Sequence, residues 1–358
     1  MTTTSPAAES NAATDAEFLE VSEPFRREII AHCYRMTGSH HDAEDLAQET
    51  FLRAWKGYAK FDHRASVRTW LHKIATNTCL TALQSSQRRP LPSGLGGDAF
   101  DPTDDLLQNH EVPWLEPYAG TADEIAPGDD ADPAYVVGAR ESVRLAFIAA
   151  LQHLPERQRA VLILRDVLQW RAAEVADTIG VTTATVNSLL QRAREQVKTA
   201  RPQQDSVGVD AATTLDDAAK RELLARYVSA FERYDVDAMV ELFTDKAIWE
   251  MPPFTGWYQG AENIGTLIRC NCPAEKAGDQ IMLPTTANGQ PAYGLYMREP
   301  DGVHRPFQLQ VLEIDPQTAK VSHVVAFFSD DMESDFARFG LPATPYDAPA
   351  RTSPSPWH

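Results

Sequence analysis

Cysteine is scarce in this sequence of 358 residues, which contains Cys33, Cys79, Cys270 and Cys272 and no other. These four lack paired C-x-x-C spacing, so the sequence indicates neither a structural zinc site nor a framework of disulfides. No stretch approaches about 18 consecutive apolar residues, and the first residues contain no basic stretch followed by an apolar core. We therefore expect a cytoplasmic protein with reduced thiols, no metal, no cofactor and no membrane partner.

Positive charge is also scarce. The formal net charge is -18 and the pI is near 4.9, which argues against a uniformly basic surface that grips DNA. The distribution is uneven, however. Residues 91–138 contain eleven acidic residues and no Lys or Arg, whereas residues 139–201 contain ten basic and six acidic residues, a local net charge of +4. A basic module beside an acidic segment can still meet nucleic acid.

The length predicts more than one domain, because single cores rarely grow beyond roughly 250 residues. Helical periodicity in two blocks gives way after them to alternating strand patterns, with Asn288-Gly289 as a hairpin turn. We expect seven segments: a disordered N-terminus at 1–17, a helical domain at 18–90, an acidic linker at 91–138, a second helical domain at 139–201, a linker at 202–214, an α+β domain at 215–341 and a Pro-rich tail at 342–358. The acidic linker is predicted to be mostly unstructured.

The first helical block has two predicted N-caps. Asp42 and Ser66 each precede a run of apolar residues at helical spacing, and residues 57–65 between the two runs have the composition of a loop. The first run places acid and amide groups on the side opposite its apolar face, where they can pair with basic residues of a partner helix. The alternative is an ordinary solvated helix face.

The second helical block predicts a tight two-helix corner over residues 172–192. Ala176 is small where the helices cross, and Gly180 allows a positive φ in the turn. Five apolar residues fall where both helices face a core: Val175, Ile179, Val181, Val186 and Leu189. The outer face is polar and basic, as a helix that enters the major groove requires. An ordinary α-hairpin with a solvated face is the alternative.

Two stretches carry a family resemblance. LPERQRAVLILRDVLQWRAAEVADTIGVTTATVNSLLQRAREQV, residues 154–197, resembles the fourth conserved region of sigma-70 family factors, which reads the minus-thirty-five promoter element. CYRMTGSHHDAEDLAQETFLRAWKGYAKFDHRASVRTWLHKIATNTCL, residues 33–80, resembles the second conserved region, which binds the clamp helices of the polymerase β′ subunit and melts the minus-ten element. This order, without a third domain, is the layout of the extracytoplasmic-function group.

The resemblance implies three sets of contact residues. Those for core RNA polymerase, through its β′ and β subunits, are Asp42, Asp45, Leu46, Gln48, Glu49 and Phe51. Those for the minus-ten element combine cations with aromatic rings that stack on unpaired bases, and they are Lys56, Tyr58, Lys60, Phe61, Arg64, Arg68, Trp70 and Asn77. Those for the minus-thirty-five element of the promoter DNA are Arg171, Thr182, Thr183, Thr185, Asn187, Ser188, Gln191 and Arg192. For Phe61 and Trp70 a core position is the alternative.

Some residues depart from the family pattern. Members often have an acidic residue where Thr81 stands and a Lys where Asn187 stands, and these departures bear on promoter sequence rather than on fold. In the acidic linker, the segment VPWLEPY at residues 112–118 is unusually apolar, and the C-terminal domain is one candidate for its docking site. By resemblance, such linkers thread through polymerase channels; a solvated spacer is the alternative.

The C-terminal domain resembles the SnoaL-like family. The segments ELFTDKAIWEMPPFTGWYQGAENI and NGQPAYGLYMRE carry this resemblance, which implies a cone-shaped α+β barrel with a pocket for a small ligand. Cyclases and isomerases of this fold need a positioned acid or base, and the candidates by residue type are Asp245, Glu250, His304, Glu313 and His323. No motif selects among them, and the C-x-C pair of Cys270 and Cys272 is weak support for redox or metal chemistry.

We therefore predict a multidomain protein of two all-α sigma domains, the second a helix-turn-helix, followed by an α+β SnoaL-like domain. Its predicted function is that of an alternative sigma factor, without a catalytic site, whose SnoaL-like domain is a built-in regulator. The alternative is a helix-turn-helix transcriptional regulator fused to a SnoaL-like enzyme. Residues 42–80 favour the first, because a plain regulator needs no polymerase-binding or promoter-melting motifs.

Overall fold

The computed structural model describes residues 15–62, 64–120, 141–200 and 216–347. These residues divide into two compact units. The first contains the described residues up to Arg89 and those between Gly120 and Gln203, and the second contains Pro90–Ala119 and those after Gln204. In the described ranges no helix combines the length and the apolar character needed to cross a lipid bilayer.

The first unit begins with helices from the N-terminal helical block. Residues 15–22 are helical and are followed by the 3-10 turn η1 (Glu23–Phe25), α2 (Arg26–Thr37), α3 (His40–Tyr58) and α4 (Val67–Leu83). The Ser66 hydroxyl accepts from Thr69 N and caps α4 as predicted. The cap of α3 is Ser39, whose hydroxyl accepts from Asp42 N, so the prediction that Asp42 caps this helix is wrong. Gly38, at φ 71°, makes the turn that brings Ser39 into place.

The rest of the first unit holds the predicted corner. Its elements are α6 (Leu145–Gln152), α7 (Glu156–Leu162), the π-helical turn η3 (Ile163–Val167), α8 (Ala172–Ile179) and α9 (Thr183–Ala200). Gly180 has φ 67° and ends α8, which confirms the predicted turn between α8 and α9. On α9 the buried leucine is Leu190, 6% exposed, and Leu189 is only half-buried. The periodicity placed the core stripe one residue too early.

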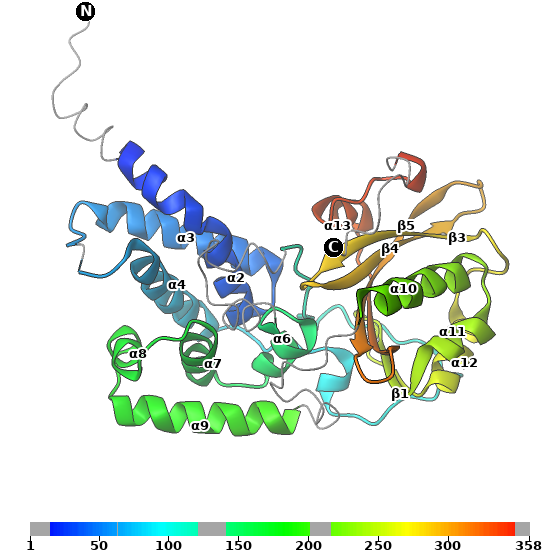
Figure 1. Cartoon of the computed structure of the whole chain (residues 1–358), viewed down its shortest axis with the longest axis horizontal. Helices are drawn as coiled ribbons and strands as arrows, with labels where there is room; N and C mark the ends of the chain where they lie inside the picture. The colour runs from blue at the N-terminus through cyan, green and yellow to red at the C-terminus, as the bar shows by residue number, and fades with distance from the viewer. Residues whose placement is uncertain (1–14, 63, 121–140, 201–215, 348–358) are drawn as a thin grey trace, which may run out of the picture. The chain divides into compact units, whose positions relative to one another are not determined.

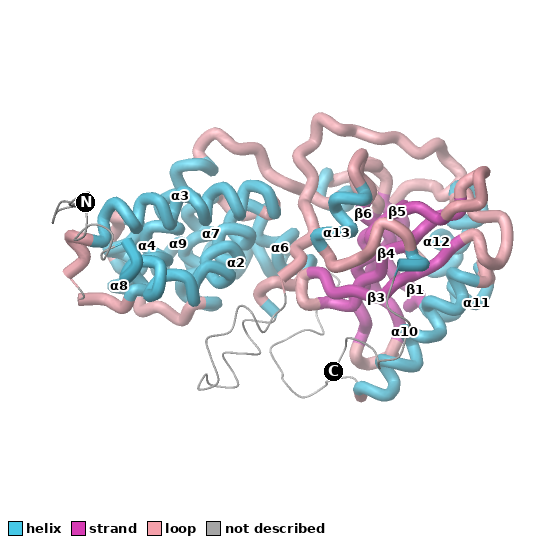
Figure 2. Tube along the Cα trace, turned by 90° about the horizontal axis from the view of Figure 1, so that it is seen from above, coloured by secondary structure: helices cyan, strands magenta, loops and turns pink. Residues whose placement is uncertain are grey.

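The two sets of helices pack together within this unit (Figure 2). The buried guanidinium of Arg35 on α2 donates to the Ser142 hydroxyl at 2.9 Å, and that of Arg159 on α7 donates to Met36 O. At the surface, Lys73 on α4 lies 2.5 Å from the Asp177 carboxylate on α8. Buried charge-assisted hydrogen bonds of this kind require close and specific packing.

The second unit is an α+β domain, as predicted. Its helices are α10 (Asp217–Glu232), α11 (Val236–Leu242), α12 (Ala261–Asn271) and α13 (Met332–Arg338), with the 3-10 turn η4 (Pro345–Asp347). Its strands are β1 (Phe243–Glu250), β2 (Trp257–Gln259), β3 (Gln280–Ala287), β4 (Gln290–Arg298), β5 (His304–Asp315) and β6 (Lys320–Phe327). They form one mixed sheet in the order β2-β1-β6-β5-β4-β3, in which β1 and β6 are parallel and the other pairs are antiparallel.

The two faces of this sheet have different covers (Figure 1). Helices α10, α11 and α12 lie over one face, and its core includes Trp249, Tyr293 and Val324. Because side chains alternate along a strand, Glu250 and His323 point to the other face, where Phe336 of α13 packs against Tyr296 at 5.0 Å between ring centroids. Asn288 and Gly289 form the β3–β4 turn with positive φ values, which confirms the predicted hairpin.

The two edge strands of the sheet are β2 and β3. On β3, Met282 N donates to the Glu232 carboxylate at 3.1 Å, and Pro284, two residues on, has no N–H. Alternate residues of an edge strand direct their backbone groups outward. On the outward side of β3, the Met282 N–H group is therefore already bonded to Glu232, and Pro284 offers no N–H group to another strand.

The first part of the acidic linker belongs to the second unit. Residues 90–119 lie along the α+β domain and include the 3-10 turn η2 (Pro92–Leu95). The prediction of a mostly unstructured linker is therefore wrong for this part, because apolar residues in it are buried on the domain. The rest of the predicted linker, with the N-terminus at 1–14, the second linker and the end of the tail, lies outside the described residues.

Candidate functional site

The exposed side of α3 carries a stripe of four residues. Asp45 and Gln48 are exposed, and Leu52 and Trp55 continue the same line at 42% and 45% exposure. Sequence reasoning selected Asp45 and Gln48 but missed the two large apolar residues. Leu52 lies seven residues after Asp45, and Trp55 lies seven residues after Gln48. Residues about two turns apart share a helix face, so this spacing is the sequence signal that could have found them.

The other residues predicted to bind polymerase lie elsewhere on α3. Asp42 pairs with Arg89 at 2.9 Å, and Glu49 pairs with Arg53 at 2.7 Å. Phe51 is buried, with the guanidinium of Arg26 stacked 4.9 Å from its ring centroid, and Leu46 is half-buried. Of the predicted set, only Phe51 is buried, and Asp42 and Glu49 hold ion pairs with side chains that remain partly exposed.

The predicted aromatic residues form a cluster. The Phe61 and Trp70 rings stack with centroids 4.6 Å apart, and Tyr58 lies 6.4 Å from each of them. Phe18 covers Tyr58 at 5.3 Å, and the Tyr58 hydroxyl donates to Glu17 at 3.1 Å. These rings therefore stabilise one another, and Phe61 and Trp70 remain half-buried rather than fully enclosed.

The predicted basic residues of this region fall into two groups. Lys56 and Lys60 are exposed, and Arg64 is exposed beside Asp62 at 3.0 Å. Arg68 instead donates two hydrogen bonds to the buried Glu28 carboxylate, at 2.5 and 2.9 Å from different nitrogens. Asn77 is exposed on α4 and donates to Lys73 O. Of the predicted cations, Lys56, Lys60 and Arg64 therefore lie open to a phosphate backbone, whereas Arg68 is held by Glu28.

Glu28 is held by a second donor as well. His72 Nε2 lies 2.9 Å from the same carboxylate. Burial alone would raise the pKa of Glu28, but the hydrogen bonds from His72 and Arg68 outweigh it and lower that pKa to about 2. Burial lowers the pKa of His72, so its imidazole is neutral and donates from Nε2. The cluster joins α2 to α4.

The outer face of α9 is exposed as predicted. Thr183, Thr185, Asn187, Ser188, Gln191 and Arg192 are all exposed on this helix, and Thr182 and Arg171 are exposed before α9 and α8. The Thr182 hydroxyl accepts from Thr185 N at 3.2 Å and so caps α9. Arg171 pairs with Glu174, while Arg194 is held by Asp166 through two hydrogen bonds at 2.7 and 2.9 Å.

In the second unit, the linker pairs with the segment that leads into β2. Asn109 N donates to Pro253 O and Thr255 N donates to Leu107 O. At the first residue of β2, Phe100 N donates to Trp257 O, and the Trp257 indole donates to Gly97 O. This exchange of backbone hydrogen bonds is the way an added strand covers a sheet edge.

The apolar segment predicted to dock on the C-terminal domain packs against the α+β domain of the second unit. Leu115 and Tyr118 are 1% and 4% exposed. At the β3–β4 turn, Tyr118 N donates to the Asn288 side-chain carbonyl at 2.9 Å, and Asn288 N donates to Tyr118 O at 2.8 Å. Asn288 therefore bonds to both the backbone N–H and the backbone carbonyl of Tyr118.

The linker also meets an acid and a histidine. The Glu250 carboxylate is 1% exposed; one oxygen accepts from His323 Nε2 at 2.8 Å and the other from Ser93 N at 2.8 Å. Burial acts to lower the pKa of His323, but the hydrogen bond and charge of Glu250 and the charge of Glu313 outweigh it and raise that pKa. Glu313 is the cross-strand neighbour of His323.

The other candidate residues of this domain do not join that group. His304 Nε2 lies 2.9 Å from Gly278 O, and its Nδ1 lies 2.6 Å from the Tyr346 hydroxyl. Cys270 is exposed, while Cys272 is half-buried with Gln280 donating to its sulfur. Asp245 is exposed on β1. The structure therefore brings together Glu250, His323 and Glu313 of the predicted acid–base set.

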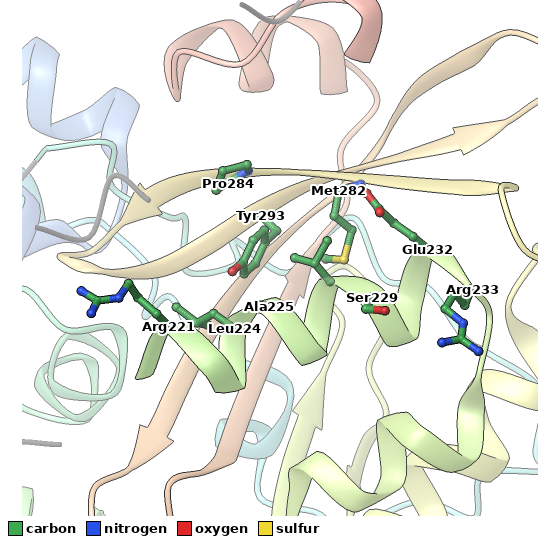
Figure 3. Close-up of a pocket in the computed structure, with 10 residues that line it drawn as sticks. Arg221, Leu224, Ala225, Ser229, Glu232, Arg233, Met282, Pro284 and Tyr293 are labelled. Carbon is green, nitrogen blue, oxygen red and sulfur yellow. Dashed lines mark hydrogen bonds between the residues drawn. The ribbon is translucent and has the colours of Figure 1, made fainter. Parts of the chain in front are cut away.

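A groove of about 430 Å³ lies between α10 and the strands β3 and β4 (Figure 3). Apolar side chains line most of it, among them Leu224, Met282 and Tyr293. Arg221 and Arg233 stand toward its two ends. In the described part of the chain, neither of these two guanidinium groups pairs with a carboxylate.

Comparison with known proteins agrees with this division of the chain. Family models match residues 22–89 (Sigma-70 region 2), 144–197 (Sigma-70, region 4) and 212–342 (SnoaL-like domain). These matches define the class: a sigma-70 family protein with a C-terminal SnoaL-like domain. The three ranges lie close to the helical and α+β domains that the sequence predicts.

Full-length relatives are more specific. The ECF RNA polymerase sigma factor SigG of Mycobacterium tuberculosis is 59% identical over 326 residues, which cover 91% of this chain and 84% of SigG. The chain therefore belongs to the ECF RNA polymerase sigma factors, which direct promoter-specific transcription initiation. SigJ of the same organism is 31% identical over 229 residues, covering 63% of this chain and 62% of SigJ.

A solved structure has the same fold. The crystal structure of the Mycobacterium tuberculosis extracytoplasmic function sigma factor SigJ superposes with a TM-score of 0.57 at 21% sequence identity. The match covers 92% of this chain and 99% of that chain. It supports the arrangement of two helical sigma domains followed by a SnoaL-like domain with a mixed sheet.

Proposed function

We propose that this sigma factor binds core RNA polymerase through the exposed stripe of α3 and reads promoter DNA with two surfaces. Lys56 and Lys60 follow the backbone of the minus-ten element, and the outer face of α9 enters the major groove at the minus-thirty-five element. The exposure of all these residues supports the assignment. Transcription by core polymerase takes place in the cytoplasm, where we place the protein.

Both promoter contacts together require the first unit to open. The two elements are named for positions about 25 base pairs apart, or roughly 85 Å at about 3.4 Å per base pair. A compact unit of this size has a radius of gyration of only about 15 Å. The packed sigma domains, joined through Arg35 and Ser142, are therefore the resting form, and they separate on the polymerase.

We propose further that the SnoaL-like domain regulates the sigma domains by holding the linker. The observation that carries this proposal is the burial of residues 90–119 on that domain, by β-type pairing and by the Leu115 and Tyr118 side chains. A linker held in this way is not free to thread through a polymerase channel. Release of the linker is then a step that precedes full activity.

A single substitution tests this regulation. Asn288→Gly removes the acceptor for Tyr118 N but keeps a residue that tolerates φ 55° in the turn. We expect higher promoter-specific output with core polymerase from the variant than from the wild-type chain. Asn263→Ala is the matched control, because Asn263 is an exposed amide on α12 that donates to Gln259 O at the end of β2 and not to the linker. Equal output from all three proteins contradicts the proposal.

The groove beside α10 is the proposed site for a small ligand, an amphipathic carboxylic acid. Its apolar lining suits a hydrocarbon body, and Arg221 and Arg233 suit a carboxylate at either end. Decanoic acid is a simple probe, and titration calorimetry is the measurement. Ala225→Trp fills the groove and should abolish binding, while Glu222→Trp, on another part of α10, should leave it intact. No heat of binding with the wild-type chain rejects this site.

We assign no catalytic role to the domain. An isomerase or cyclase needs its acid or base to face substrate in a cavity. The Glu250–His323 pair instead lies against Ser93 of the linker, on the sheet face opposite the core of α10, α11 and α12. The alternative function, a SnoaL-like enzyme fused to a DNA-binding regulator, is therefore not supported by an acid or base that faces a cavity.

A further inference from the structure

We propose that Glu250 and His323 form a proton-dependent latch that fastens the linker to the SnoaL-like domain. The proposal rests on the regulatory function above, because it names the residues that would set how firmly the linker is held. Ser93 N is the point of attachment, and Glu250 is the residue that both linker and histidine share. His304, another candidate, bonds instead to Gly278 O and to the Tyr346 hydroxyl within the domain.

The geometry gives Glu250 two separate duties. One carboxylate oxygen accepts from the backbone of Ser93 at 2.8 Å, and the other accepts from His323 Nε2 at 2.8 Å. Ser93 lies in the 3-10 turn η2, two residues before its end, so this bond fixes the turn and not merely a passing loop. The carboxylate is only 1% exposed, so water cannot replace either donor while the linker is docked.

Burial makes the pair depend on its charges. A carboxylate that leaves water needs a compensating partner, and a protonated imidazole supplies one. His323 on β6 faces two acids, Glu250 on β1 and Glu313 directly across on β5. The linker meets Glu250 through the neutral Ser93 N–H group. With its proton, His323 balances the buried Glu250. Without that proton, His323 supplies no positive charge to balance the buried Glu250 carboxylate.

The direction of the pH effect follows from linkage. In the docked structure Glu250 and Glu313 hold the pKa of His323 above its ordinary value of about 6.5. If that pKa falls toward the ordinary value on release of the linker, docking is firmest below about pH 6.5 and weakens as the pH rises through the docked-state pKa. When the linker leaves, water hydrates the Glu250 carboxylate, and this carboxylate then stabilises the protonated His323 imidazole less. Alkaline shift therefore loosens the latch, and acid shift tightens it.

Hydrogen exchange in the full-length protein tests the latch at its attachment point. The protection factor of the Ser93 amide, corrected for the intrinsic exchange rate at each pH, measures how often the latch opens. In the wild-type chain we expect this factor to fall several-fold between about pH 6 and about pH 9, by at most about tenfold per pH unit for a single proton. The amides of Leu312 and Val324, within the sheet, report that the domain itself stays folded.

Two variants separate the charge from the hydrogen bond. Glu250→Gln removes the charge and one of two acceptors, and should lower Ser93 protection by about tenfold at pH 6 and abolish its pH dependence. His323→Gln keeps a donor near the Nε2 position but never carries a charge, so Ser93 protection should no longer change with pH and should stay near the low level of the wild-type chain at about pH 9. His304→Gln is the control: it removes the domain's other described histidine, which does not contact the linker, and should behave as the wild-type chain does.

The outcomes of these experiments distinguish failure of the latch from failure of the regulatory function. Ser93 protection that is constant with pH in the wild-type chain, or the same in Glu250→Gln as in wild type, overturns the latch. If Glu250→Gln loosens the linker yet leaves transcription unchanged, the latch stands and the regulatory function fails. If Asn288→Gly raises transcription while Glu250→Gln leaves Ser93 protected, the regulatory function stands and the latch fails.

Discussion

At the scale of residues, the cluster around Glu28 shows how a predicted DNA contact can belong to the interior. Arg68 was selected because a cation in an aromatic-rich segment suits single-stranded DNA. In the structure its guanidinium closes on Glu28, with His72 as a further donor, and the three join α2 to α4. A carboxylate with a side chain 9% exposed is costly to leave without partners, so this pairing comes before any contact with phosphate.

Glu28→Gln should therefore destabilise the first unit. We expect a loss of about 2–3 kcal/mol in the free energy of unfolding near pH 7, because Arg68 loses its ionised partner in a mostly buried site. The folded-state pKa of about 2 lies below the unfolded value near 4.5, so this stabilisation is present above about pH 5 and is lost as the pH falls toward 2. Denaturant unfolding of both proteins over that range measures the difference, which should shrink with acid. A constant difference would contradict the ionic explanation.

At the scale of elements, α9 was predictable in its turn and in its outer face, but not in its core register. Gly180 marks the corner because few other residues tolerate φ 67°. Polar residues after it can face only outward. Leu189 and Leu190 are adjacent, however, and either fits an apolar stripe; the structure buries Leu190 and leaves Leu189 half-buried, because the packing of other helices on α9 decides the register. The caps show the same limit, since Ser39 and Asp42 are both good N-cap residues and only Gly38 places the chain to use Ser39.

Substitutions on α9 should separate base reading from phosphate binding. Asn187→Ala is expected to relax the preference for one base pair of the minus-thirty-five element by about 1–3 kcal/mol, because an exposed amide near the helix start can bond two base atoms. Arg192→Ala should weaken binding to all promoter sequences alike and reduce the salt dependence by about one counterion. Holoenzyme binding to a set of single-base promoter variants at two salt concentrations distinguishes the two effects. Identical profiles would remove Asn187 from base reading.

At the scale of the whole molecule, composition predicted the number of domains and their classes but misplaced the linker. Eleven acidic residues with scattered Pro and Gly have the composition of a solvated tether. The docked part depends instead on partners far away in sequence, such as Asn288 for Tyr118 and Glu250 for Ser93. Only the apolar segment at residues 112–118 gave a local sign of this docking. Likewise, nothing local to α2 indicates that Arg35 bonds to Ser142, 107 residues away.

Locking the first unit closed should block initiation. Lys73 Nζ lies 2.5 Å from an Asp177 oxygen, so a carbodiimide can join them by an amide bond of zero added length. We expect the cross-linked chain to lose promoter-specific transcription, because its two sigma domains can no longer reach both promoter elements. Lys73→Arg keeps the ion pair but cannot form the amide, and the treated variant should stay active. Full activity of the treated wild-type chain, with the Lys73–Asp177 bond verified by mass spectrometry, would show that no opening is needed.

The docked linker has a further consequence for how the protein survives in a crowded cell. A sheet with open edges is a template for self-association. Here Glu232 and Pro284 blunt the β3 edge permanently, whereas the linker covers the β2 edge only while it is docked. A chain that has released its linker therefore exposes a row of unpaired backbone groups at residues 253–257. A chain that releases its linker without binding polymerase would therefore be prone to aggregate through this edge. The docked linker protects the unbound protein by covering the edge.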